Sequence, residues 1–152
     1  MLRVALAALH LIALGIGLGS VIQRGVALRD TPTHDSLRRA FRADMMWGIA
    51  AGLWITTGLW RALAGTEKTL DYYLSNHVFL AKMGMLALIL ALEVRPMITL
   101  IKWRSALAGG GDPATLTQKD AGKIATVSHI QALLVVLMVI AAAAMARGYG
   151  AR

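Results

Sequence analysis

The chain has 152 residues, of which 57% are hydrophobic and 16% charged, and its net charge at neutral pH is +8. Soluble domains of this length are less apolar, so the composition indicates an integral membrane protein whose first partner is the lipid bilayer. No cysteine is present, which excludes disulfide bonds, cysteine-ligated iron–sulfur clusters and thiol chemistry.

A helix needs roughly 17 to 25 mainly apolar residues to cross a hydrocarbon core about 30 Å thick. Four segments reach that length: 2–22, 45–64, 78–100 and 124–147. The first has the charged start and small final residues of a signal peptide, but it is long enough to span, and we expect a retained helix. Because the connections are short, the sequence predicts a single domain over residues 1–152, an all-α integral membrane protein folded as an antiparallel four-transmembrane-helix bundle.

Lysine and arginine residues are concentrated in two of the connections. Ten lie in or beside the first and third connections: Arg24, Arg29, Arg38, Arg39, Arg42, Arg95, Lys102, Arg104, Lys119 and Lys123. Five lie on the other side: Arg3, Arg61, Lys68, Arg147 and Arg152. Because cytoplasmic loops are enriched in these residues, we expect both termini to be extracytoplasmic and the protein to reside in the inner (plasma) membrane. Positive charge that follows the topology in this way gives no reason to expect a nucleic-acid partner.

Two connections carry further signals. In residues 31–43, the large apolar side chains share one helical face while the arginines point elsewhere, which fits a basic helix on the membrane surface and equally a solvated loop. Residues 108–116 include the sequence GGGDP, which is typical of a flexible linker. Before the third span, Ser75 or Asn76 is expected to cap the helix.

Four ionisable residues lie within the predicted spans: His10, Lys82, Glu93 and His129. A charged side chain at mid-bilayer costs about 2.5 to 3.5 kcal/mol, so such a residue normally faces the bundle interior and is a candidate site. Lys82 and Glu93 lie on one stripe of the third span, about 16 Å apart along its axis. They therefore cannot form an ion pair with each other.

The helical rise places these residues in two polar layers separated by an apolar middle. The external layer holds His10 and Lys82 with Thr56 and Thr57 of the second span, and these four are candidates for pairing with a ligand or substrate. Two simpler interpretations stay open. Lys82 can extend its long stem to the headgroups, and His10 can be an ordinary hydrogen-bonded interior histidine.

The cytoplasmic layer holds Glu93 and His129, with Asp44 nearer the surface. We interpret Glu93 and His129 as an internal polar pair that either ties the third and fourth spans together or takes part in proton transfer.

Three stretches suggest a family relationship: "RADMMWGIAAGLWITTGLWRALAGTEK", "YYLSNHVFLAKMGMLALILALEVRPMITLIKWR" and the closing "MARGYG". Together they resemble a bacterial family of small four-helix membrane proteins with no assigned function. The resemblance extends over nearly the whole chain and implies motif positions but no chemistry. The motif positions are Asp44, Trp47, Arg61, Glu67, Tyr72, Tyr73, Asn76, Lys82, Glu93 and Arg147.

A more distant resemblance rests on the "LH" of the first span and the lysine near the start of the third. These features are similar to HemJ-type protoporphyrinogen oxidases and to copper-resistance D-type membrane proteins. The resemblance implies haem b, with His10 as an axial ligand and Lys82 paired with a propionate or a substrate carboxylate. This chain departs from the pattern, because Ala81 stands where that family has a histidine.

Three hypotheses about function follow, and the sequence does not decide whether the protein is an enzyme. The first is a haem- or porphyrin-associated redox protein. The second is a structural or assembly subunit that forms a homo-oligomer or joins a larger membrane complex. Small residues such as Gly15 with Gly19 and Gly48 with Gly52 are then expected at helix contacts. The third is a small ion or solute carrier in which the buried charges mark the route.

Overall fold

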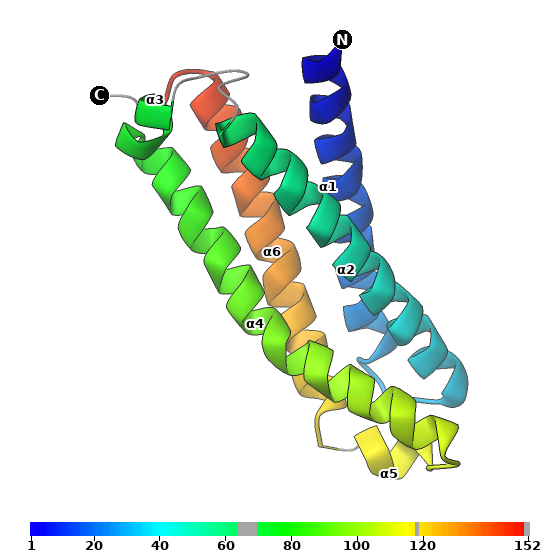
Figure 1. The fold of residues 1–152 in the computed structure, drawn as a ribbon. Helices are drawn as coiled ribbons and strands as arrows, with labels where there is room; N and C mark the ends of the chain where they lie inside the picture. Colours follow the sequence, from blue (N-terminus) through cyan, green and yellow to red (C-terminus); the bar gives the residue numbers. More distant parts are fainter. Residues whose placement is uncertain (64–69, 118, 151–152) are drawn as a thin grey trace.

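The computed structural model describes residues 1–63, 70–117 and 119–150, and all regular secondary structure in these ranges is helical, with no strand (Figure 1). This confirms the all-α prediction. The elements are α1 (Leu2–Ala27), α2 (His34–Leu63), α3 (Leu70–Ser75), α4 (His77–Ala108), α5 (Pro113–Thr117) and α6 (Ala121–Ala146).

The four long helices, α1, α2, α4 and α6, lie side by side, and each runs in the direction opposite to the long helix before it (Figure 1). Helix α1 packs closely against α2 and also contacts α6, and α6 in turn contacts α4. Helices α2 and α4 scarcely touch each other. The arrangement therefore remains open on the side between α2 and α4.

Helix α1 is longer than the first predicted span, which ended at residue 22. Apolar residues continue after Arg24, and Leu28 at the C-terminal cap is fully buried. The helix can continue because the charge of Arg24 has partners inside the protein, as described below. Arg24 thus belongs to the helix core, and its assignment to a basic connection was wrong.

The segment 31–43 is mostly helical, because α2 begins at His34 and continues without a break into the second predicted span. The Thr33 hydroxyl accepts a hydrogen bond from the Ser36 N–H at 3.2 Å, and the Ser36 hydroxyl accepts one from the Thr33 N–H at 2.8 Å, which caps the helix. Leu37 is buried, whereas the neighbouring arginines are exposed. The alternative of a solvated loop is therefore wrong for residues 34–43.

The segment 108–116, predicted to be a flexible linker, is partly helical, because α5 begins at Pro113. Helix α4 also extends to Ala108, well beyond residue 100, and carries Pro96 inside it. Only the few residues between these helices, including Gly110 with its φ of 85°, form a turn.

Two groups of buried apolar side chains form the core. One lies at mid-length and includes Trp47, Trp54, Ile89 and Val135; the other lies toward α5 and includes Trp103. Most remaining large apolar side chains point outward, as expected for helices that face lipid. Among the described helices, α1, α4 and α6 are long and apolar enough to cross a membrane.

The glycines expected at helix contacts point away from the neighbouring helices. A methyl group added at Gly15, Gly19, Gly48 or Gly52 would meet no atom within 4 Å. Gly17 is the residue that allows close packing here, because its added methyl would lie 3.3 Å from the Trp47 ring. The GxxxG spacing therefore did not identify the contacts within the chain.

Asn76 caps α4, as one of the two sequence alternatives expected. Its Oδ1 accepts hydrogen bonds from the N–H groups of Val78 at 2.9 Å and Phe79 at 3.1 Å. Its Nδ2 donates to the carbonyl of Tyr149 at 3.3 Å, and the His77 N–H donates to the carbonyl of Gly150 at 3.3 Å. The residues after α6 are thereby fastened to the start of α4.

We expect Gly150→Ala to release this C-terminal segment. Gly150 has a φ of 82°, and an added methyl would lie 2.6 Å from Val78 Cγ2 and 2.7 Å from Asn76 Oδ1. The strain is expected to cost about 1 to 2 kcal/mol locally and to speed hydrogen exchange at the His77 amide. Gly148→Ala is the matched control, because Gly148 has a φ of 88° but open space around it. Equal exchange rates in the two variants would contradict the packing argument.

Candidate functional site

Arg24 is completely buried and uses all five of its N–H groups. Its Nε donates to Ser128 Oγ at 3.0 Å, and Nη1 donates to Asp44 Oδ1 at 2.7 Å and to Glu93 Oε1 at 2.6 Å. Its Nη2 donates to Glu93 Oε2 at 2.9 Å and to Gln131 Oε1 at 2.7 Å. We call these five residues the Arg24 cluster.

The Arg24 cluster joins all four long helices. Arg24 comes from α1, Asp44 from α2, Glu93 from α4, and Ser128 and Gln131 from α6. Gln131 Nε2 also donates to Glu93 Oε2 at 2.8 Å and to the Ile89 carbonyl at 3.1 Å. A buried charge is tolerated when its hydrogen bonds are complete, so the cluster stabilises one arrangement of the four helices.

The two carboxylates of the cluster differ in how many bonds they accept. Glu93 accepts from both Nη atoms of Arg24 and from Gln131. Asp44 accepts through Oδ1 only, and within the described residues no hydrogen bond reaches its Oδ2. With both carboxylates ionised, one arginine faces two acids, so the cluster carries a net charge of −1. Neither acid is fully enclosed, since their side chains are 16% and 19% exposed.

Close contact between α1 and α6 keeps Ser128 beside Arg24. A methyl group added at Gly25 would lie 3.0 Å from the His129 ring and 3.2 Å from Ser128 Cβ. The absence of a side chain at Gly25 therefore allows α6 to approach α1 at the level of the cluster.

We expect Gly25→Ala to destabilise the protein by about 1 to 3 kcal/mol, because the added methyl must push α6 away from Arg24. Thermal unfolding in mild detergent would measure the loss. Gly19→Ala, on the same helix with nothing within 4 Å, is the control and should be neutral or slightly stabilising. Equal stability of the two variants would show that α1 and α6 are not in close contact here.

A cavity of about 120 Å³ lies between α2 and α4, and we call it the α2–α4 groove. Trp47 and Ala51 line it from α2, and Leu86 and Leu90 line it from α4. Asp44 and Glu93 also line it. The groove exists because α2 and α4 make few contacts, and its walls are otherwise almost wholly apolar.

A second polar group surrounds His10. The indole N–H of Trp54 donates to His10 Nε2 at 3.0 Å, and Trp can only donate. The ring proton therefore lies on Nδ1, which donates to Thr57 Oγ1 at 3.0 Å. Thr57 in turn donates to the Leu53 carbonyl at 2.6 Å. Both nitrogens of His10 are thus occupied in a neutral ring.

Several other predicted site residues are placed differently from the expectation. Thr56 is exposed and bonds to carbonyls of its own helix, apart from the His10 group. His129 packs against Gly25 of α1, and no hydrogen bond joins it to Glu93 among the described residues. Asp44, predicted on the same side as Glu93 but nearer the surface, shares Arg24 with Glu93 in the Arg24 cluster.

The remaining motif residues are spread along the molecule. Trp47 is buried against α1, and Tyr73 is buried with its ring 4.9 Å from that of Phe79. Lys82 and Arg61 are half-buried, and Arg147 is exposed just after α6. Glu67 and the side chain of Tyr72 lie outside the described residues.

Sequence reasoning missed two members of the cluster, Arg24 and Gln131. A signal for Arg24 was present, because the residues around it read "SVIQRGVAL" and are apolar on both sides of the charge. Polar residues without charge, such as Gln131, give a much weaker signal, since a glutamine within a span is common enough to be overlooked.

Three helices suited to crossing a bilayer, and a buried arginine whose N–H groups are all bonded inside the protein, place the chain among helical integral membrane proteins. Residues 2–150 match the family model described as predicted membrane protein (DUF2214), and the chain belongs to that family. A search of curated proteins found no match, and neither did a search of solved structures. These comparisons add no support for the resemblance to HemJ-type oxidases or copper-resistance proteins.

Proposed function

We propose that all four long helices cross the inner membrane as an antiparallel bundle. Helix α2 is the least apolar of them, but the charge of Asp44 is paired with Arg24, and its outer face presents exposed Ile49, Leu53 and Leu59 to lipid. A charge that is paired inside the protein does not oppose insertion as a free charge would.

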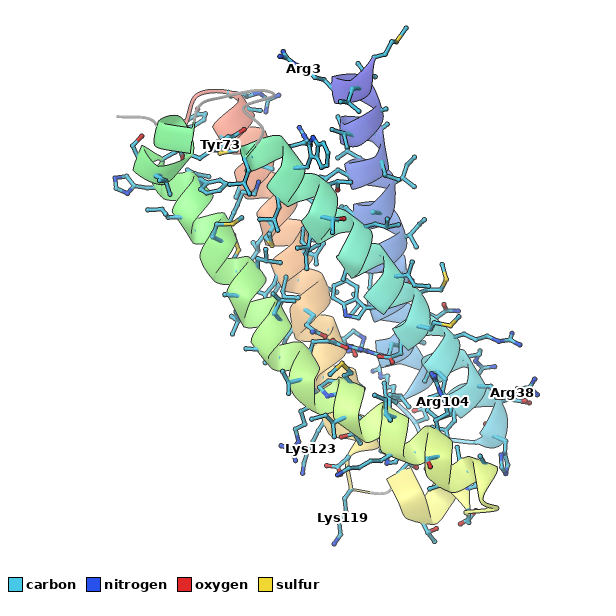
Figure 2. The ribbon with its side chains drawn as sticks, viewed as in Figure 1. Arg3, Arg38, Tyr73, Arg104, Lys119 and Lys123 are labelled. Carbon is cyan, nitrogen blue, oxygen red and sulfur yellow. The ribbon has the colours of Figure 1, made fainter. Side chains whose placement is uncertain are left out.

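The orientation that we propose places both termini outside the cell. Arg38, Arg104, Lys119 and Lys123 lie at the end of the molecule opposite Arg3 (Figure 2). The positive end belongs on the cytoplasmic side by the usual bias of membrane proteins. The chain has no cysteine, so single cysteines introduced at Arg3 and Lys119 can be tested one at a time with a membrane-impermeant thiol reagent added to intact cells. We expect labelling at position 3 alone.

The proposed function is the binding of a lipid-soluble amphiphile in the α2–α4 groove. The observation that carries it is the groove itself, an opening between two spanning helices whose walls are apolar and whose polar groups are Asp44 and Glu93. A ligand can enter such an opening sideways from the bilayer. This is the binding step of the solute-carrier hypothesis.

The contacts of His10 favour this proposal over a haem protein. A haem iron at Nε2 would have to displace the indole of Trp54, and one at Nδ1 would displace Thr57. His10 therefore does not fit an axial haem ligand in this arrangement. We expect the purified protein to show no Soret band after haem is added, and a band lost in His10→Ala would restore the haem hypothesis.

Native mass spectrometry of protein purified in mild detergent tests the binding function. We expect one amphiphile per chain in the wild type and none in Ala51→Phe, because a ring at Ala51 would fill the groove. Ala91→Phe, on the exposed side of α4, is the matched control and should keep the ligand.

Brominated dodecyl probes, added in the same detergent, provide a second measurement. They should quench tryptophan fluorescence, because Trp47 and Trp54 line the groove. If neither an amphiphile nor a probe binds, the proposal is wrong.

A further inference from the structure

We propose that the ligand of the α2–α4 groove is a monocationic amphiphile, such as a long-chain amine or quaternary ammonium compound, whose positive head lies beside Asp44. The inference rests on the binding function proposed above and names its ligand class. It follows from the charge balance of the Arg24 cluster, from the open oxygen of Asp44, and from the shape of the groove.

The charge balance favours a cation. Arg24 supplies one positive charge against the two carboxylates of Asp44 and Glu93, so one negative charge is left without a partner in the cluster. An uncompensated charge beside an apolar cavity strongly attracts an opposite charge, because few water molecules screen it. An anionic ligand would meet the same excess charge as repulsion.

The position of the open oxygen puts that charge where a ligand can reach it. Glu93 uses both of its oxygens on Arg24, and Gln131 covers one of them further. Among the described residues, Asp44 accepts through Oδ1 alone, while its side chain lines the groove and remains 16% exposed. Asp44 Oδ2 is therefore the acceptor that a cationic head would meet.

Other charged groups near Asp44 compensate its charge only in part. Arg104 reaches from α4 toward α2, close enough for its charge to act on Asp44, but it stacks on the Phe41 ring at 5.1 Å and donates to the Phe41 carbonyl at 3.3 Å. It is exposed and does not line the groove. From α6, His129 faces Gly25 of α1, and no ion pair joins it to Asp44 among the described residues.

The shape of the groove favours an amphiphile over a small cation. From Asp44 to Ile55 along α2, and from Met97 to Leu86 along α4, the lining extends about 16 Å. Asp44, Glu93 and Met97 lie toward the positive end of the molecule, and the rest of the lining is apolar. With a volume of about 120 Å³, the groove holds only part of a chain, so the remainder would lie in the surrounding lipid.

Three probes that differ only in their head groups test the inference. Bromododecyl trimethylammonium, bromododecanol and bromododecanoate carry the same quenching chain with a positive, neutral or negative head. We expect the cationic probe to quench the groove tryptophans with an apparent affinity at least about tenfold tighter than the neutral probe, and the anionic probe to bind more weakly than both. This comparison uses the wild-type protein, so it does not depend on a variant that folds.

The variant Asp44→Asn then tests whether the Asp44 carboxylate causes the preference for the cationic probe. We expect the variant to bind the cationic probe no better than the neutral one, so that the difference between the two probes disappears. Asp35→Asn, at the exposed start of α2, removes the same charge away from the groove and should leave the preference intact.

The possible results separate the two proposals. Equal binding of all three probes, abolished by Ala51→Phe, would overturn the cation preference and leave the binding function standing. No quenching by any probe would overturn both proposals. If no probe quenches and native mass spectrometry shows a dimer that Ala51→Phe dissociates, a second copy of the chain occupies the groove. The proposal of a cationic ligand is then also wrong.

Discussion

Arg24→Met is expected to destabilise the protein by about 3 to 5 kcal/mol, the largest effect of any substitution that we consider. The methionine side chain fills a similar volume, but it leaves Asp44 and Glu93 without their shared cation and removes the donors that reach Ser128 and Gln131. Reversible unfolding in mixed micelles with increasing denaturing detergent would measure the difference.

Two further variants show whether the loss comes from charge. Arg24→Lys keeps the positive charge but has three donors on one nitrogen, so it cannot reproduce five bonds to four partners and should lose roughly half as much stability as methionine. The triple variant Arg24→Met, Asp44→Asn, Glu93→Gln leaves no buried charge and should recover part of the loss. Arg29→Met removes an exposed arginine nearby and should change stability by less than about 0.5 kcal/mol. A loss for Arg24→Met no larger than for Arg29→Met would contradict the role of the cluster.

Glu93→Ala is expected to cost about 3 kcal/mol, clearly more than Asp44→Ala, although both remove one carboxylate from the same arginine. Glu93 accepts three hydrogen bonds and connects α4 to both α1 and α6. Asp44 accepts one bond and is partly open to the groove. The same unfolding experiment measures both losses.

The comparison also bears on the ligand. Asp44→Asn retains an oxygen that can accept from Arg24 and should cost only about 1 kcal/mol, which keeps that variant folded for binding experiments. An equal loss for Glu93→Ala and Asp44→Ala would mean that the two acids share the arginine evenly, and the case for Asp44 as the open site would weaken.

The sequence predicted the membrane class and the helical fold because both depend on local properties. A run of apolar residues long enough to cross a bilayer can be recognised without knowing what it contacts. The cap at Asn76 was also predictable, since an N-cap depends on residues a few positions apart.

The candidate site was only partly predictable. Glu93 and Asp44 were recognised as polar residues inside or beside spans, but Glu93 was paired with His129, because Arg24 had been placed in a connection. That error followed from treating an arginine as the end of a span. The residue is buried because partners on three other helices satisfy it, and a pattern in one helix does not reveal partners on another.

The groove and the state of His10 depended entirely on tertiary packing. Whether α2 touches α4 is decided by how α2 packs on α1, α4 on α6, and α1 on α6, and neither sequence segment indicates that α2 and α4 stay apart. Likewise, the neutral ring of His10 follows from an indole donor forty-four positions away.

The sequence by itself determined that this protein is a helical membrane protein with charged residues inside its apolar segments. Its hydrophobic runs and its distribution of lysine and arginine are properties of neighbouring residues, which act through the bilayer as a common solvent. The tertiary structure alone decided which charges meet, that one arginine joins four helices, and that Asp44, bonded to Arg24 through Oδ1, also lines the groove. Those outcomes depend on distances between residues far apart in the chain, and packing of the helices sets these distances.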